Sequence, residues 1–367
     1  MSDLILDRIS KSYGKTQVLS EASIEVKAGE TVVVCGPSGA GKTVLLRLVA
    51  GVVEPDTGDI RIAGRSVINV GPERRDIGMA FQNFALYPHL SAFENIASPL
   101  RARGLAAGEI KRRVEEISSL LRIEHVLGHT PRELSNGQKQ RTSLARSLVR
   151  GPGVLLLDDP LRNVDAKLRY EMRLELPRLL RNFGSAVLYV TQDYKEAMAL
   201  ADRIAVLRAG RIEQLAPASA IYDAPESIEV ARLFGDPTIN LYPIRPEAEG
   251  GAAVVRLFGQ IWRLPRGREA AIDRDCLLGL RPEDVRIGGE GGHPGSVAFE
   301  LEAVTPLNVR GVLYLRGPAG EELLATVPER DIGQFGRGHR RIWIDLPAEK
   351  LHLFDRQSGA RIAPAAA

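Results

Sequence analysis

The sequence predicts a mixed α/β domain with a parallel sheet, followed by a smaller all-β domain. A continuous apolar run, Thr31–Cys35, leads directly into the glycine-rich segment Gly36–Thr43. Two more apolar runs follow at Val154–Leu157 and Ala186–Val190. Runs without polar alternation are typical of parallel strands that are buried on both faces. From about residue 236 onward, many glycines and prolines and short alternating segments favour antiparallel β-structure instead.

The composition is that of a soluble globular protein. At 367 residues the chain is long enough for two or three domains. Its net charge of +3 is not gathered in a long basic run, which argues against nucleic acid as the main partner. We expect neither a signal peptide nor a membrane span, because no sufficiently long apolar run occurs. Cys35 and Cys276 indicate no disulfide framework, and this fits a reducing cytoplasm.

Periodic patterns predict the remaining elements in chain order. Glycine turns bound two short strands near the start, and a mainly helical insertion spans residues of about 83–150. We expect the domain boundary between residues 235 and 236. The expected elements are strands at Leu4–Ile9 and Ser23–Val26, helices at Thr43–Ala50, Glu109–Leu121 and Gln138–Val149, a hairpin at Arg203–Leu215 that turns at Ala209 and Gly210, β segments at Ser296–Leu301 and Gly311–Leu315, and a loop at Gly288–Gly295.

The glycine-rich segment fits the phosphate-binding pattern G-x-x-x-x-G-K-[ST] at each required position. Its glycines let consecutive backbone N–H groups turn toward an anion at the start of a helix. Lys42 would meet the β- and γ-phosphates, and the Thr43 hydroxyl would ligate Mg²⁺. A glycine-rich turn with an incidental lysine is the alternative, which the flanking strand and helix disfavour. The predicted nucleotide-binding residues of this segment are Gly36, Pro37, Ser38, Gly39, Ala40, Gly41, Lys42 and Thr43.

Two further segments gain a functional interpretation from their place after this loop. Asp158 ends an apolar strand, and beside a phosphate loop such a carboxylate can hold Mg²⁺ through water. Taken alone, it is more often a helix cap or turn residue. Ser135 and Gly137 precede a predicted helix, where a hydroxyl and N–H groups can meet a phosphate. The alternative for them is a plain N-cap.

Seven strings follow one another along the chain in the order KSYGKTQVL, GPSGAGKT, FQNFALYPHLS, ELSNGQKQR, LLLDDPLRNVDAKLR, VTQDYKEAMALADRI and LRPEDVRI. Together they resemble the ATP-binding subunit of an ATP-binding-cassette (ABC) transporter, in particular of carbohydrate-type importers. The resemblance runs almost from end to end of the chain, and the order and spacing are more specific than any one string. The final string resembles the oligonucleotide-binding-like regulatory domain of those subunits, which supports the β prediction for residues 236–367.

The resemblance assigns roles to individual positions. It implies that Tyr13 stacks on adenine, and that Gln82 touches both Mg²⁺ and the attacking water. The stretch Asn83–Leu90 would help to dock a membrane subunit, with Phe84, Leu86 and Tyr87 as its apolar residues. Two cassettes would pair head to tail, so that each ATP lies between one Lys42 loop and the other chain's signature. That signature comprises Ser135, Gly137 and Gln138, and Asn163 and Asp165 would lie at the interface.

The same resemblance implies ligands, partners and a location. The ligands are ATP and Mg²⁺. The partners are two transmembrane permease subunits, a second ABC ATPase subunit and, indirectly, an extracytoplasmic solute-binding protein. The chain would lie on the cytoplasmic face of the inner membrane. Sugar, polyol, glycerol or glycerol phosphate is the expected cargo class, by analogy with the family alone.

Three positions depart from the family pattern. Asp159 stands where the family has a catalytic Glu, and its carboxylate reaches less far toward an attacking water. Gln192 stands where the family has His, and its amide can donate a hydrogen bond but carries no charge. Asn136 replaces the first signature Gly, a milder change because Asn tolerates left-handed backbone. With Gln82, the residues Asp159 and Gln192 are the predicted catalytic set.

These departures predict a slow site in an asymmetric pair, whose second cassette is a different and more active chain. One rival is a nucleotide-gated scaffold with essentially no hydrolysis of its own. Another is a soluble cassette protein that acts on DNA or ribosomes. The single cassette, the docking-type stretch and the absence of basic arms count against the second rival.

Overall fold

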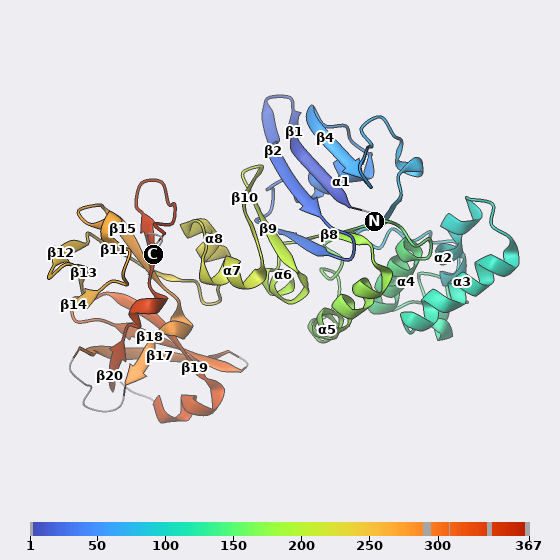
Figure 1. The fold of residues 1–367 in the computed structure, drawn as a ribbon. Helices are drawn as coiled ribbons and strands as arrows, with labels where there is room; N and C mark the ends of the chain where they lie inside the picture. The colour runs from blue at the N-terminus through green and yellow to red at the C-terminus, as the bar shows by residue number, and fades with distance from the viewer. Residues whose placement is uncertain (1–2, 289–294, 308, 336–339, 364–367) are drawn as a thin grey trace. The chain divides into compact units, whose positions relative to one another are not determined.

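The computed structural model describes residues 3–288, 295–307, 309–335 and 340–363. The chain divides into two compact units, Met1–Ala218 and Ser219–Ala367, coloured along the chain in Figure 1. The division expected between residues 235 and 236 falls inside the second unit. The reason is that helix α8 (Ile228–Leu233) packs its Ile228 and Ala231 against Ile239 and Phe354.

The first unit is centred on a six-stranded sheet with the order β10-β9-β3-β8-β7-β6. Its strands are β3 (Thr31–Cys35), β6 (Ile77–Ala80), β7 (Val154–Asp158), β8 (Ala186–Thr191), β9 (Arg203–Arg208) and β10 (Arg211–Ala216). Pairing is parallel from β9 through β3, β8 and β7 to β6, whereas β9 and β10 form the expected antiparallel hairpin. Every residue of β3, β7 and β8 is buried, as their unbroken apolar runs predicted.

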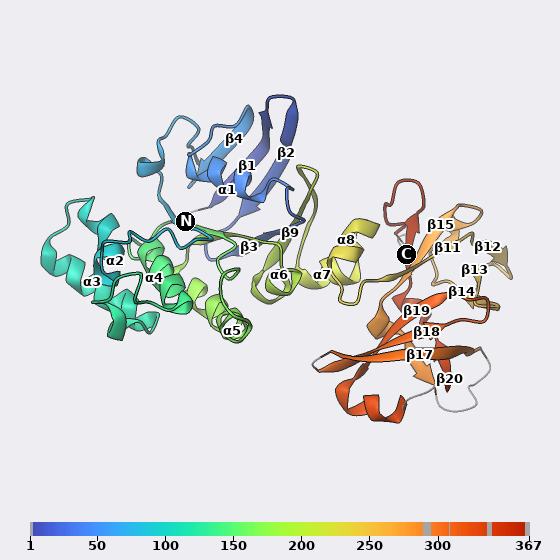
Figure 2. The same cartoon turned by 180° about the vertical axis from the view of Figure 1, so that it is seen from behind.

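An antiparallel sheet of order β2-β1-β4-β5 packs beside it. Its strands are β1 (Leu4–Tyr13), β2 (Thr16–Val26), β4 (Thr57–Ile62) and β5 (Arg65–Ser66). Helix α1 (Lys42–Ala50) shares one hydrophobic core with both sheets. In both views of the ribbon α1 lies close to β1 and β4 (Figures 1 and 2).

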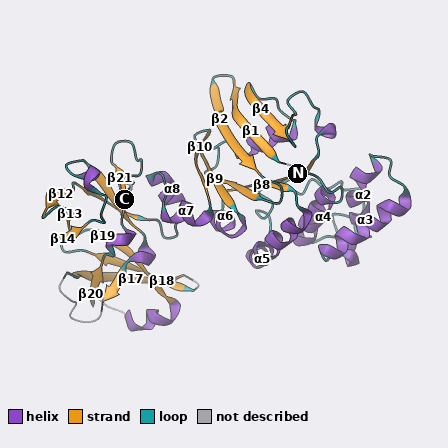
Figure 3. Ribbon diagram, viewed as in Figure 1, coloured by secondary structure: helices purple, strands orange, loops and turns teal. Residues whose placement is uncertain are grey.

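Five more α-helices belong to the described part of this unit, and the first three of them pack on one another (Figure 3). They are α2 (Ala92–Arg101), α3 (Ala107–Leu120), α4 (Asn136–Leu148), α5 (Ala166–Phe183) and α6 (Tyr194–Leu200). Polar N-caps set where four of these helices begin. In each, a side-chain oxygen accepts a hydrogen bond from a backbone N–H group of the first turn, and the capping residues are Ser91, Ser135, Asp165 and Asp193. Helices α2, α3 and α4 lie in the insertion expected at about residues 83–150.

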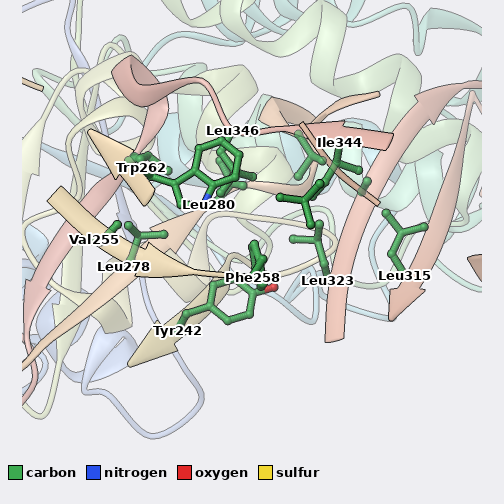
Figure 4. Packing of buried hydrophobic residues seen from close by; sticks show 14 of the residues in the cluster. Tyr242, Val255, Phe258, Trp262, Leu278, Leu280, Leu315, Leu323, Ile344 and Leu346 are labelled. Carbon is green, nitrogen blue, oxygen red and sulfur yellow. The ribbon is translucent and has the colours of Figure 1, made fainter. Parts of the chain in front are cut away.

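The second unit is antiparallel throughout its sheets, which confirms the all-β prediction. Its sheets have the orders β11-β15-β21, β12-β13-β14 and β16-β20-β17-β18-β19. Figure 4 shows the aromatic centre of its core, where Phe258 packs edge to face on Tyr242 at 4.9 Å between ring centroids. Residues 289–294 of the loop expected at Gly288–Gly295 lie outside the described residues. The elements are α7 (Ala218–Asp223), α8, β11 (Asn240–Ile244), β12 (Glu247–Glu249), β13 (Ala252–Leu257), β14 (Gln260–Arg263), β15 (Cys276–Leu280), β16 (Arg286–Gly288), β17 (Val297–Leu307), β18 (Arg310–Arg316), β19 (Glu322–Pro328), β20 (Arg340–Asp345) and β21 (His352–Asp355).

A buried arginine closes the C-terminal end of α1. Arg75 is 4% exposed and donates to the carbonyls of Leu48 and Val49 at 2.9 and 2.7 Å and to that of Val70 at 2.8 Å. The Leu48 and Val49 carbonyls belong to the last turn of α1, where a helix end leaves carbonyls without their i+4 partners. The guanidinium therefore fixes the helix that begins at Lys42.

Replacing Arg75 with Ala is expected to destabilise the first unit by about 2–3 kcal/mol, because the carbonyls of Leu48, Val49 and Val70 lose this donor. The measurement is the first thermal transition in scanning calorimetry. The neighbouring Arg74 is the matched control, since its side chain is 77% exposed and only pairs with Glu73. Arg74→Ala should cost less than about 0.5 kcal/mol. Equal effects of the two substitutions would contradict the capping role.

Candidate nucleotide site

A cavity of about 300 Å³ lies at the carboxyl ends of the parallel strands, where ligands bind in open α/β sheets. Its lining unites segments that are far apart in the sequence: the glycine-rich loop, Gln82, the end of β7 and the residue after β8. The lining residues are Val18, Ser38, Gly39, Gly41, Lys42, Thr43, Val44, Gln82, Asp158, Asp159, Arg162, Val190 and Gln192. The three predicted catalytic residues and the three predicted Mg²⁺ ligands are all among them.

The glycine-rich loop connects β3 to α1. Gly39 and Gly41 have φ angles of 81° and 104°, the left-handed region that favours glycine. Gly36 must also lack a side chain, because an added Cβ would lie 2.1 Å from the carbonyl oxygen of Leu207. The loop thus makes a tight turn before α1 begins, and turns of this kind let backbone N–H groups face an anion.

Lys42 is buried, and its ammonium group is held by the loop itself. Nζ donates to the carbonyl oxygens of Gly36 and Pro37, both at 2.8 Å. Burial lowers the pKa of Lys42, and the charge of Asp159 opposes this shift. These two hydrogen bonds hold the lysine ammonium in the cavity wall.

The oxygen donors in the cavity suit a hard divalent cation. The Thr43 hydroxyl donates to Asp158 Oδ1 at 3.3 Å, and the Gln82 amide lines the same cavity. Burial raises the pKa of Asp158, against the hydrogen bond from Thr43. In the described part of the chain no group of three His, Cys, Asp or Glu side chains forms a complete metal site. One carboxylate with a hydroxyl and an amide fits Mg²⁺, which keeps waters and takes phosphate oxygens in such sites.

Asp159 sits in a strained, tightly determined position. Its φ is 45°, and its backbone N–H donates to the Val190 carbonyl at 2.8 Å. Its Oδ1 lies 3.4 Å from the Thr191 hydroxyl, and its Oδ2 lies 3.8 Å from an Arg162 guanidinium nitrogen. Burial raises the pKa of Asp159, while Arg162 lowers it and Asp158 adds to the rise. The carboxylate thus faces the cavity beside a second carboxylate.

Behind Asp159 lies a buried acidic network. The carboxylate of Glu196 accepts from the Tyr189 hydroxyl at 3.0 Å and from the Thr191 hydroxyl at 2.9 Å. Asp193 caps α6 and also pairs with Arg173. These contacts fix the segment after β8 that carries Gln192 into the cavity.

Several predicted residues lie outside the cavity lining. Tyr13 is half exposed, near the end of β1, with Lys11 Nζ 5.6 Å from its ring centroid. Ser135 and Gln138 form a capping box, because Ser135 Oγ accepts from the Gln138 N–H at 3.3 Å while Gln138 Oε1 accepts from the Ser135 N–H at 2.9 Å. Within this chain Ser135 therefore caps α4, and its predicted role toward the nucleotide of a second cassette stays a prediction. Gly36, Pro37 and Ala40 belong to the loop but do not line the cavity, and neither does Gly137.

Arg162 is the charged residue of this lining that the sequence prediction missed, and the apolar Val18, Val44 and Val190 were not predicted either. It stands three residues after Asp159 in the turn between β7 and α5, and its backbone N–H donates to the Asp159 carbonyl at 3.2 Å. That i, i+3 spacing from a predicted catalytic carboxylate was the available signal.

The stretch expected to dock a membrane subunit is held in place by two helices. Asn95 of α2 accepts from the Tyr87 N–H and donates to the Leu90 carbonyl, and Arg146 of α4 donates to the Ala85 carbonyl. Tyr87 is exposed, with the Arg146 guanidinium 5.5 Å from its ring centroid, while Phe84 and Leu86 are half-buried. A fixed backbone thus presents an exposed aromatic ring.

Neutralising Asp159 is expected to stabilise the nucleotide-free protein. A carboxyl whose folded pKa is raised loses stability as pH rises through that pKa, so the charged form costs stability at pH 7. Asp159→Asn should therefore raise the melting temperature of the first unit by about 2–4 °C at pH 7. The difference should shrink as pH falls and the wild-type carboxyl takes up its proton. A variant less stable than wild type at pH 7 would contradict this account.

Comparisons with known proteins agree with this geometry. The ABC transporter family model matches residues 19–162. The sn-glycerol-3-phosphate import ATP-binding protein UgpC of Chromobacterium violaceum is 42% identical, covering 100% of this chain and 98% of the relative. The protein of the same name from Cereibacter sphaeroides is 40% identical, covering 99% and 100%. The dimeric ATP-binding cassette MJ0796, solved in a post-hydrolysis state with ADP and Pi, is similar with a TM-score of 0.53 and 29% identity, over 59% of this chain and 98% of that one.

Proposed function

Because this chain belongs to the family of ABC importer ATP-binding proteins, we propose that it drives the import of glycerol 3-phosphate or a related polyol or sugar. It is an ABC ATPase of carbohydrate-importer type, and ATP hydrolysis coupled to transport is the activity of this family. The observation that carries the proposal is the cavity that unites Lys42, Thr43, Asp158 and Asp159. The cargo class rests on the relatives, which are named as glycerol-3-phosphate importers.

In the proposed site the glycine-rich loop binds the phosphates of ATP through its N–H groups, and Lys42 neutralises the terminal ones. Thr43, Gln82 and Asp158 would hold Mg²⁺, which supplies charge neutralisation on the phosphate oxygens when bound. Asp159 accepts a proton from the attacking water, and Gln192 donates a hydrogen bond to the terminal phosphate. Tyr13 stacks on the adenine ring.

The proposed working unit contains two cassettes. The relative MJ0796 is a dimeric cassette, and Ser135, Gly137 and Gln138 lie outside this chain's own cavity lining. Both observations support a head-to-tail pair in which each chain's signature closes on the nucleotide of the other. ATP binding would close the pair, and hydrolysis would reopen it.

The proposed location is the cytoplasmic face of the inner membrane, against two permease subunits. Among the described residues no helix has the length and apolar character needed to cross a bilayer. The segment around the exposed Tyr87 would dock the permease subunits. An extracytoplasmic binding protein would deliver the solute to them.

A finer proposal is that hydrolysis at this site is slow and that the second cassette is a different, faster chain. It rests on Asp159 and Gln192, which give the site a shorter base and an uncharged amide. Counting the ATPase chains in the purified complex by native mass spectrometry tests it. A complex with two copies of this chain and no other cassette would overturn the asymmetric arrangement.

The test of the main proposal is solute uptake by the complete complex in liposomes with ATP inside. Labelled glycerol 3-phosphate should accumulate in an ATP-dependent manner. Unlabelled glycerol, maltose and inorganic phosphate, added in excess, should compete less well than unlabelled glycerol 3-phosphate. Strong competition by maltose would indicate that the cargo is a sugar. Uptake that is independent of ATP would overturn the proposal.

A further inference from the structure

We propose that Arg162 contacts the terminal phosphate of the ATP held by its own chain, and supplies positive charge that Gln192 cannot carry. This inference rests on the proposed function, because it concerns the same nucleotide site. The two residues line one cavity with Lys42 and with the carboxylates of Asp158 and Asp159.

The backbone around Arg162 is fixed on several sides. Leu161 and Val164 are buried, and the Asn163 side-chain amide donates to the Gln82 carbonyl at 2.9 Å. The guanidinium of Arg169 donates to the Leu161 and Val164 carbonyls at 3.2 and 3.0 Å. The turn therefore presents the Arg162 side chain at a determined place, beside the catalytic carboxylate.

The guanidinium itself is held only loosely. Its side chain is 52% exposed, and it lies 3.8 Å from Asp159 Oδ2. Charge-assisted hydrogen bonds are shorter, at about 2.7–2.9 Å, and an exposed ion pair of this kind contributes about 0–1 kcal/mol. A phosphate with two accessible oxygens is a stronger partner, because a guanidinium can bind it through two parallel hydrogen bonds.

The charge balance of the cavity also favours a contact between Arg162 and a phosphate. Its charged lining residues in the described part of the chain are two cations, Lys42 and Arg162, and two carboxylates, Asp158 and Asp159. Without Arg162 the lining would carry a net negative charge toward a polyanionic ligand. Arg162 thus offsets the charge of Asp159 before ATP binds, and it is positioned to turn to the terminal phosphate afterwards.

Nucleotide affinity of the purified full-length chain tests this inference, using displacement of a fluorescent ATP analogue by ATP and by ADP. Arg162→Ala should weaken ATP binding by about 10-fold, the value of one charged hydrogen bond, and ADP binding by less than about 3-fold. Arg162→Lys should keep most of the preference for ATP, and Arg162→Gln, which keeps a polar side chain without the positive charge, should lose it. Arg178→Ala on α5 removes another exposed arginine and should change neither affinity.

An ATP to ADP affinity ratio in Arg162→Ala and Arg162→Gln within 2-fold of wild type would overturn the inference. Hydrolysis by the complete complex gives a second readout, because Gln192→His should restore part of the rate that Arg162→Ala removes. Additive effects of these two substitutions would also count against a shared phosphate. Failure of the proposed function looks different, since wild-type complexes would then show no ATP-dependent uptake.

Discussion

Replacement of Lys42 by Ala is expected to lower ATP hydrolysis by the complete transport complex at least about 1,000-fold. The lysine ammonium is buried in the cavity wall, where it donates to two loop carbonyls. Removing it takes away a cation that would face the phosphates in the proposed site, and leaves the carboxylates of Asp158 and Asp159 in the same cavity. Nucleotide affinity and turnover should therefore fall together.

The measurements are ATP turnover by the reconstituted complex and nucleotide binding by the full-length chain. Lys27→Ala is the matched control, because Lys27 is an exposed lysine on the loop after β2. Its substitution should leave both quantities unchanged. If Lys42→Ala bound ATP as tightly as wild type, the assignment of the phosphate site to Gly36–Thr43 would be wrong.

Much of the fold followed from patterns that depend on local sequence. The run Thr31–Cys35 is buried on both faces because parallel strands flank it on each side, and nothing in that environment interrupts an apolar run. The first two strands were predicted too short. β1 continues to Tyr13, but register shifts around Ile9 and Lys11 break the regular alternation. A search for strict alternation of apolar and polar residues misses the part of a strand where bulges interrupt that alternation.

How much of the site could be predicted from the sequence was limited for a different physical reason. Lys42, Thr43 and Asp158 could be predicted because a spacing motif and a strand end place them together. Arg162 was missed because its spacing of three residues from Asp159, the signal that was available, does not show whether the side chain turns back toward that carboxylate. The place of α8 in the second unit also escaped prediction, because it depends on Ile228 meeting Phe354, far away in sequence. Contacts of this kind have no local signature.

The double substitution Asp159→Glu with Gln192→His is expected to speed ATP turnover of the complex by about 10- to 100-fold. The longer carboxylate reaches the attacking water, and the imidazole can carry positive charge at the terminal phosphate. Both changes lie in one site, so their effects need not multiply. A wild-type complex that already turns over as fast as the double variant would make Asp159 an efficient base and would contradict the slow-site proposal.

Asp159→Asn separates the catalytic role of this carboxylate from its cost to stability. The variant should lose essentially all turnover that depends on this site, because an amide cannot accept the proton of the attacking water. The same substitution should raise the melting temperature, since it removes a buried charge whose pKa is already raised. A residue that only supported the fold would move both quantities downward. Loss of turnover together with a gain in stability therefore identifies Asp159 as a group held in a strained position for the reaction with ATP.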